Sequence, residues 1–279
     1  MIVSKNNILE RTNDKPILWD VFYEQHDTPL PLVIFCHGYK GFKDWGAWDL
    51  VAKAFAKAGF CFVKFNFSHN GGTMEQPIDF PDLEAFGQNN YSKELEDLDD
   101  MINMLLSNET ILEVIDAKTI ALIGHSRGGG IVTIKASEDT RITHLISWAG
   151  VSNFERRTAT IGDLDEWKQD GVKYILNGRT KQQMPHYYQF YEDFVKNKDR
   201  LHIEYACKRI EIPHLIAHGI EDPSVKYFEA EELHSWNLKS TLLPIKNCDH
   251  VFNTKHPWDG TELSEELRFL VSKTVGFFQ

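Results

Sequence analysis

The chain has 279 residues, of which 42% are hydrophobic and 25% are charged. This composition is typical of a folded globular protein and excludes disordered, collagen-like and coiled-coil chains. The net charge of -11, from 30 Lys and Arg against 41 Asp and Glu, argues against a nucleic-acid-binding protein, whose binding domain should be basic.

The sequence indicates a cytoplasmic protein without a membrane partner. Its first residues contain no apolar stretch of the kind found in signal peptides, and no apolar run approaches the roughly 20 residues that span a bilayer. Four scattered cysteines, without a CxxC pair, are expected to be buried free thiols in a reducing compartment: Cys36, Cys61, Cys207 and Cys248.

Short apolar segments alternate with longer helical patterns along the chain. Strands are expected at 32–36, 60–65, 119–124, 144–150, 214–219 and 241–246, and helices at 47–58, 92–106, 128–137, 226–234 and 264–278. Strands that are nearly all apolar and each followed by a helix predict a parallel sheet covered on both faces. The earlier segments 8–11 and 17–23 alternate more and are expected to form an antiparallel edge.

Residues 151–209 interrupt this alternation. We expect them to form a helical cap inserted between two parts of an α/β core, residues 1–150 and 210–279, because a structureless loop of this length is rare in a compact domain. The stretch 187–194 predicts a helix with an aromatic face. Tyr187, Tyr188 and Tyr191 either contact a substrate or pack the insertion onto the body, and the sequence leaves both interpretations open.

The most informative motif is Gly124-His125-Ser126-Arg127-Gly128, which has the pattern GxSxG. The pattern alone is weak evidence, but here it lies between an apolar strand and a helix, as a nucleophile elbow requires. Such a turn holds the serine in a strained backbone conformation at the end of the strand. Side chains at 124 or 128 would collide with neighbouring elements, so glycine is expected at both positions.

A serine nucleophile needs a base, which is in turn oriented by an acid. In this type of sheet the expected chain order is Ser, then Asp or Glu, then His. Asp222 follows the strand at 214–219 and is the predicted acid, with Glu221 as a competitor expected to be a solvated charge. His250 follows the last strand, 28 residues after Asp222, and is preferred as the base over His234 and His256.

Acyl transfer also needs donors for the developing oxyanion. One is the backbone N–H after the nucleophile, at Arg127, and the other comes from the loop after the strand at 32–36. That loop reads His37-Gly38-Tyr39-Lys40-Gly41, so the Tyr39 amide is the second predicted donor.

Taken together, these motifs resemble the α/β-hydrolase superfamily, and most closely its dienelactone hydrolase, prolyl-oligopeptidase-like and acyl-esterase branch. The residues that carry the resemblance are GHSRGG at 124–129, HGYKG at 37–41, HGxxDxxV at 218–225 and DHVF at 249–252. It implies an α/β-hydrolase fold with a mostly parallel, eight-stranded type of sheet. A serine at 126 argues against a dienelactone hydrolase proper, which uses cysteine.

The predicted function is a serine hydrolase that cleaves a carboxylic ester of a small-molecule acyl compound, without a cofactor or metal. Alternatives on the same residues are an acyltransferase, a thioesterase or a small-peptide peptidase. A non-catalytic ligand-binding protein of the same fold is the alternative from another class. The acidic surface predicts little attraction for anionic substrates, which local cations at Lys40, Arg127, Arg156 or Arg157 would reverse. The sequence does not decide whether the chain forms a homo-oligomer.

Overall fold

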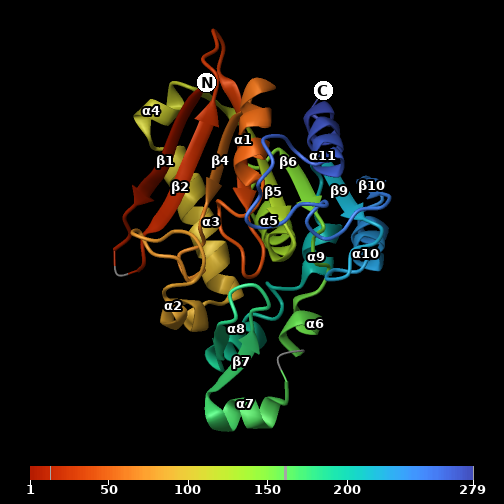
Figure 1. The fold of residues 1–279 in the computed structure, drawn as a ribbon. Coiled ribbons are helices and arrows are strands. Elements are labelled where there is room, and N and C mark those ends of the chain that lie inside the picture. Colours follow the sequence, from red (N-terminus) through yellow and green to blue (C-terminus); the bar gives the residue numbers. More distant parts are fainter. Residues whose placement is uncertain (13, 160–161, 279) are drawn as a thin grey trace.

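A computed structural model describes residues 1–12, 14–159 and 162–278, in which a central eight-stranded sheet carries helices on both faces (Figure 1). The strand order is β1-β2-β4-β3-β5-β6-β9-β10. These strands are β1 (Ile2–Leu9), β2 (Ile17–Tyr23), β3 (Leu30–Cys36), β4 (Cys61–Phe65), β5 (Ile115–His125), β6 (His144–Trp148), β9 (His214–Gly219) and β10 (Thr241–Ile245). The helices of the core are α1 (Trp48–Lys57), α2 (Leu83–Gln88), α3 (Tyr91–Leu105), α4 (Glu109–Leu112), α5 (Arg127–Glu138), α10 (Phe228–Trp236) and α11 (Glu265–Gly276).

The predicted α/β class and mostly parallel sheet are confirmed. In the order of the large sheet, every neighbouring pair in β4-β3-β5-β6-β9-β10 is parallel. By contrast, β1 pairs with β2 and β2 pairs with β4 in antiparallel fashion. The antiparallel edge was expected, but its outer strand runs over Ile2–Leu9 rather than 8–11. Most of β1 is exposed, so its sequence lacks the apolar periodicity that marks a buried strand.

The core has two layers, one on each face of the sheet. Along β3, Leu32, Ile34 and Cys36 pack into one layer, and Val33 and Phe35 pack into the other. This follows from the period of two in a strand, which sends successive side chains to opposite faces. A strand buried on both faces is apolar at nearly every position, and this explains why these segments were recognisable in the sequence.

Residues 151–209 contain α6 (Phe154–Ala159), α7 (Leu164–Asp170), β7 (Val172–Leu176), β8 (Gln183–Tyr187), α8 (Gln189–Lys196) and α9 (Ile203–Lys208). The expectation of an all-helical segment is wrong in one respect, because β7 and β8 form an antiparallel two-stranded sheet. The predicted helix at 187–194 begins only at Gln189, after Tyr187 has ended β8. Tyr174 and Leu176 on β7 are more than half exposed, so no buried-strand pattern marked this pair.

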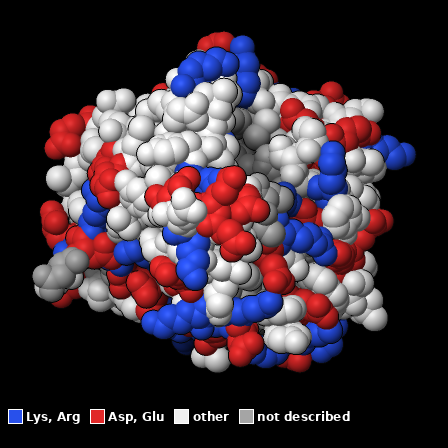
Figure 2. All heavy atoms as spheres, turned by 90° about the horizontal axis from the view of Figure 1, so that it is seen from below, with Lys and Arg blue, Asp and Glu red and all other residues white. Residues whose placement is uncertain are grey.

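Much of this segment lies beyond one end of the large sheet, where α6, α7, β7 and α8 form the lower part of the molecule in Figure 1. Figure 2 looks onto that end and shows acidic and basic side chains interspersed over it. None of the helices in the described ranges combines the length and the apolarity that crossing a bilayer requires.

Candidate active site

Ser126 lies at the junction between β5 and α5 with backbone angles φ 57° and ψ -120°. A non-glycine residue with positive φ is strained, and such strain persists only where surrounding contacts hold it. The Ser126 amide donates to the Trp148 carbonyl at 3.0 Å, and the Ser126 carbonyl accepts from the Gly129 amide at 2.9 Å. The serine is thereby held at the end of the sheet in the conformation that the motif predicts.

The two motif glycines lie where a side chain has no room. A Cβ on Gly124 would lie 2.2 Å from the Gly128 carbonyl oxygen, and one on Gly128 would lie 2.4 Å from the Cys36 carbonyl oxygen. These obstacles are backbone atoms, which cannot rotate away. The expected need for glycine at both positions is confirmed, and the close approach places the first turn of α5 directly against the end of β3.

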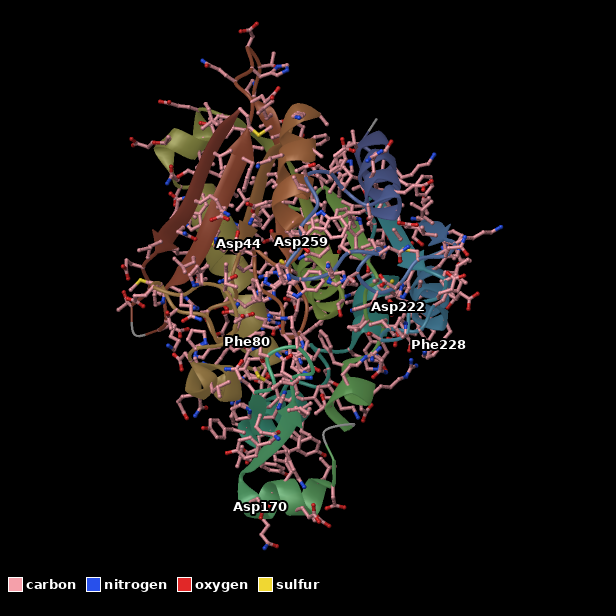
Figure 3. The ribbon with its side chains drawn as sticks, viewed as in Figure 1. Asp44, Phe80, Asp170, Asp222, Phe228 and Asp259 are labelled. Atoms are coloured by element: carbon pink, nitrogen blue, oxygen red, sulfur yellow. The ribbon has the colours of Figure 1, made fainter. Side chains whose placement is uncertain are left out.

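The structure brings Ser126, His250 and Asp222 into one chain of hydrogen bonds. Ser126 Oγ lies 3.0 Å from His250 Nε2, and His250 Nδ1 lies 2.7 Å from Asp222 Oδ2. Because the carboxylate accepts only, Nδ1 carries a proton and Nε2 is left as the acceptor for the serine hydroxyl. Asp222 follows β9, as Figure 3 shows, and His250 lies in the loop after β10.

Asp222 is buried and held by four donors. Its Oδ1 accepts from the amides of Ser224 at 2.7 Å and Val225 at 2.9 Å, and Oδ2 accepts from His250. His218 Nε2–H is shared between the Val225 carbonyl at 2.8 Å and Asp222 Oδ2 at 3.3 Å. Burial opposes ionisation of Asp222, but the hydrogen bonds from His218 and His250 outweigh it and hold its pKa well below the usual range. The carboxylate therefore stays charged at neutral pH and can stabilise a positive His250.

The competing residues lie elsewhere in the hydrogen-bond network. His234 bonds through Nδ1 to Ser240 Oγ, and His256 Nδ1 accepts from the Gly46 amide. Glu221 is exposed, as expected of a solvated charge, and its Oε2 also accepts the Cys248 amide at 3.0 Å. Since Cys248 precedes His250 by two residues, this bond fixes the start of the loop that carries the histidine.

His125, the second residue of the motif, supports the His250 loop from the other side. Its Nε2–H donates to the His250 carbonyl at 2.8 Å, and the two rings are 4.8 Å apart. Burial and the neighbouring His250 lower the pKa of His125 to about 3, so this imidazole is neutral. These contacts give His125 a structural role in holding the His250 loop.

The loop after β3 passes over the serine. A Cβ on Gly38 would lie 2.7 Å from Ser126 Cβ, which shows how closely the backbone approaches. His37 fixes this loop, because its Nδ1–H donates to the Gly38 carbonyl at 2.9 Å while Nε2 accepts from the Phe67 amide at 3.2 Å. Burial lowers the pKa of His37 to about 4, which keeps the ring neutral and this pattern intact.

A cavity of about 320 Å³ opens at Ser126 and His250. Its other lining residues are Tyr39, Tyr91, Arg127, Val151, Phe154, Arg157, Ile175, His186, Ser224 and Val225. Five of these come from residues 151–209, and the sequence patterns missed Tyr91, Phe154, Ile175 and His186. Of the described residues that line the cavity, two are arginines and none is Asp or Glu. A smaller hollow of about 180 Å³, bounded by Trp45, Trp48 and the loop 37–41, also reaches Ser126.

Tyr187, Tyr188 and Tyr191 do not line either hollow in the described structure. The Tyr187 hydroxyl donates to Glu84 and its ring packs on Gly87. Tyr188 and Tyr191 pack with the buried Trp167 at ring distances of 5.6 and 6.3 Å. These contacts correspond to the packing interpretation of the three tyrosines.

His186 on β8 connects the segment 151–209 to the loop over Ser126. Its Nδ1–H donates to the Met184 carbonyl at 3.2 Å, which leaves Nε2 to accept from the Tyr39 hydroxyl at 2.8 Å. Burial and the nearby Arg127 lower the pKa of His186 to about 3. No local signal marked His186, because its partner lies 147 positions earlier in the chain.

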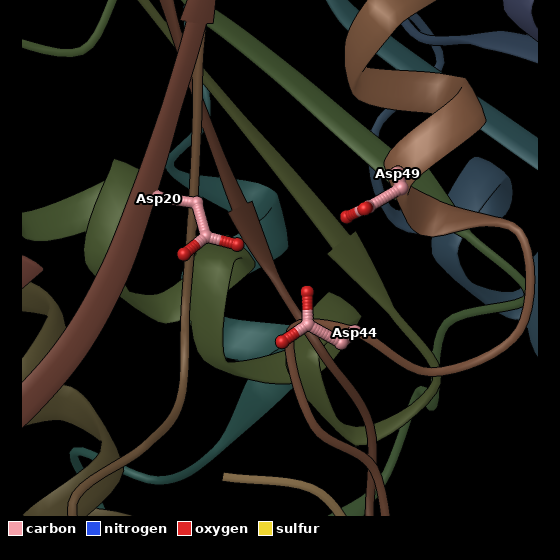
Figure 4. Close-up of side chains that lie close together, drawn as sticks. All are labelled: Asp20, Asp44 and Asp49. Carbon is pink, nitrogen blue, oxygen red and sulfur yellow. The ribbon is translucent and has the colours of Figure 1, made fainter. Parts of the chain in front are cut away.

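One cluster away from this cavity has the composition of a metal site. The carboxylates of Asp20, Asp44 and Asp49 converge within 4.8 Å of one another (Figure 4). The fully buried ammonium groups of Lys43 and Lys64 occupy that space, each within 3.0 Å of Asp20 and 2.6 Å of Asp44. The cluster is a buried ion-pair network, in which lysines supply the positive charge that a cation would bring.

Comparison with known proteins places this architecture in a family. Residues 31–203 match the family described as alpha/beta hydrolase fold, and the chain belongs to that family. A curated relative, an uncharacterized 31.7 kDa protein in the traX-finO intergenic region of Escherichia coli, is 30% identical over 147 residues. That match covers 53% of this chain and 46% of the relative, so the chain spans about half the length of the curated relative.

Solved structures show the same fold over nearly the whole chain. Est1E from Butyrivibrio proteoclasticus has a TM-score of 0.71 at 16% identity, covering 99% of this chain and 98% of that one. A putative hydrolase from Agrobacterium vitis has a TM-score of 0.73 at 16% identity and full coverage of both chains. The esterase domain of a Rhodothermus marinus protein has a TM-score of 0.65 at 16% identity, covering 99% and 98%.

Proposed function

We propose that this protein is a serine hydrolase that cleaves a carboxylic ester through an acyl-enzyme on Ser126. The observation that carries the proposal is the hydrogen-bond chain from Ser126 Oγ through His250 to Asp222, at 3.0 and 2.7 Å. Esterases among the structural neighbours are consistent with it.

The residues have complementary roles in acylation. Ser126 Oγ attacks the ester carbonyl carbon while His250 Nε2 takes the hydroxyl proton, and Asp222 stabilises the resulting imidazolium. The carbonyl oxygen becomes an oxyanion, for which the amides of Tyr39 and Arg127 are the proposed donors. As the C–O bond to the alcohol breaks, His250 returns its proton to the leaving oxygen.

Deacylation repeats these steps with water. His250 takes a proton from a water molecule while the water oxygen attacks the acyl carbon. The bond between Ser126 Oγ and the acyl carbon then breaks, and His250 returns the proton to Oγ. The products are a carboxylic acid and an alcohol. If a second alcohol, amine or thiol took the place of water, the same residues would perform acyl transfer, and product ratios measured with a competing acceptor separate the two reactions.

The direct test is covalent labelling of the serine. A fluorophosphonate incubated with the wild type is expected to add one adduct to the intact mass, and Ser126→Ala is expected to add none. Ester turnover by Ser126→Ala above a few per cent of wild type would refute the assignment. A protein that neither labels nor turns over small 4-nitrophenyl esters would be a non-catalytic ligand-binding member of the fold.

We further propose that residues 151–209 act as a cap on a core formed by residues 1–150 and 210–279. Phe154, Arg157, Ile175 and His186 from this segment line the cavity at Ser126 and support this division. The four cysteines are buried free thiols, which suits the proposed cytoplasmic location.

A further inference from the structure

Arg127 follows the serine directly, and its side chain reaches the same cavity. The guanidinium carbon lies 4.4 Å from the ring centre of Tyr39, 5.4 Å from that of Tyr91 and 5.5 Å from that of Phe190. Three aromatic rings thus hold one cation by cation–π contacts. A side chain held in this way loses little further freedom when it binds a ligand.

The hydrogen-bonding capacity of Arg127 is mostly unused. Among the described residues it makes one hydrogen bond, from Nη1 to Glu94 Oε1, and at 3.2 Å this bond is long for a charged pair. A guanidinium carries five N–H donors in a planar fork. The Arg127 side chain is 13% exposed and lines the cavity, so donors remain for a ligand there.

The carboxylate that pairs with Arg127 does not belong to the cavity lining. Glu94 is buried and does not line the cavity, and its Oε1 is shared with the Asn89 amide, while its Oε2 has no partner among the described residues. Burial raises the pKa of Glu94 even though Arg127 opposes this shift. The field of Arg127 extends to the cavity lining, where burial and then Arg127 lower the pKa of His186.

We infer that the cavity binds a carboxylate carried by the ester substrate, with the Arg127 guanidinium as its partner. The second arginine, Arg157, lines the same cavity and pairs with Glu229, and no described lining residue is Asp or Glu. The face in Figure 2 mixes both signs of charge. A preference for anionic substrates would therefore come from the cavity and not from the surrounding surface. This inference rests on the proposed esterase function and names its substrate class: a carboxylate-bearing ester small enough for about 320 Å³.

Matched esters test the inference. Mono-4-nitrophenyl adipate carries a carboxylate on its acyl side, and methyl 4-nitrophenyl adipate is its neutral counterpart. The pair 4-(butyryloxy)benzoate and its methyl ester places the charge on the alcohol side. In at least one pair, kcat/KM of the wild type is expected to favour the anion by about 10- to 100-fold, as one charged hydrogen-bonded partner provides.

Arg127→Met keeps a straight apolar stem against Tyr39 and removes the charge, so the preference is expected to fall below about 3-fold. Arg156→Met is the matched control. Arg156 carries the same charge on α6, pairs with Glu232 and does not line the cavity, so this variant should retain the preference. Equal preferences in wild type and Arg127→Met, in enzyme that still labels at Ser126, would overturn the inference and leave the esterase function standing.

A binding experiment keeps the two proposals separable. Calorimetry on Ser126→Ala with monomethyl adipate and dimethyl adipate needs no turnover. We expect Ser126→Ala to bind monomethyl adipate saturably and not to bind dimethyl adipate. The binding of monomethyl adipate should be lost in Ser126→Ala/Arg127→Met. Absence of monoacid binding together with absence of any anionic preference in turnover would refute the carboxylate site, whereas absence of Ser126 labelling would refute only the hydrolase.

Discussion

Replacing Gly128 with alanine tests the close approach of α5 to β3. Helix propensity alone predicts a gain of up to about 1 kcal/mol, because Gly128 lies in the first turn of α5. The new Cβ, however, would lie 2.4 Å from the Cys36 carbonyl oxygen and 2.7 Å from that of His37. Non-bonded atoms are best separated by about 3.5 Å, so the first contact is about 1 Å too short.

Overpacking of this kind costs up to about 3 kcal/mol, and backbone obstacles place Gly128→Ala near that limit. We therefore expect a net loss of about 2 kcal/mol in the free energy of unfolding, measured by urea denaturation. Turnover should fall by roughly 100-fold, since a shift of about 1 Å between β3 and Ser126 misplaces the Gly38 loop. Gly276→Ala is the control: nothing lies within 4 Å of its Cβ position at the end of α11, so it should be neutral or slightly stabilising. A Gly128→Ala protein as stable as wild type would refute the packing argument.

Three further predictions concern single side chains. Asp222→Asn should lower kcat by about 10⁴-fold in steady-state assays, because the amide cannot hold His250 in the required tautomer; a loss under about 10-fold would contradict the assigned role. His214 is buried without a hydrogen-bond partner among the described residues, and burial lowers its pKa to about 3. The unfolded chain therefore takes up a proton near pH 6.5 that the folded protein does not, so stability is full above that pH and falls as pH decreases toward 3. His214→Leu should flatten the urea-derived stability profile by up to about 1.4 kcal/mol per pH unit between pH 6 and 4, and an unchanged slope would exclude this contribution. Tyr188→Ala and Tyr191→Ala should each lower the melting temperature without altering acyl-chain preference, because both side chains pack with Trp167; altered preference in folded variants would restore a substrate-contacting role.

The parts of the fold that were predictable share one physical property. β3 and residues 120–124 of β5 are buried on both faces, so their sequences are continuously apolar and end at recognisable glycine turns. The order of Ser126, Asp222 and His250 followed from strand ends, because parallel strands bring their carboxyl ends to one edge. Local sequence therefore sufficed to nominate side chains that meet across 28 and 124 positions of the chain.

The lining of the cavity could not be predicted in this way. His186 meets Tyr39 across 147 positions, and it lies on β8, whose short and partly polar sequence contains Pro185. Tyr187 was a natural candidate for substrate contact from its aromatic neighbours alone. Its hydroxyl instead reaches Glu84 on α2, a contact that no periodicity in either segment encodes.

The central claim is that Ser126 is an activated nucleophile in a chain with His250 and Asp222. The most direct measurement is the intact mass of wild type, Ser126→Ala and Asp222→Asn after brief exposure to a fluorophosphonate. We predict one adduct on the wild type, none on Ser126→Ala, and much slower labelling of Asp222→Asn. Equal labelling of all three proteins, or none on wild type, would contradict it.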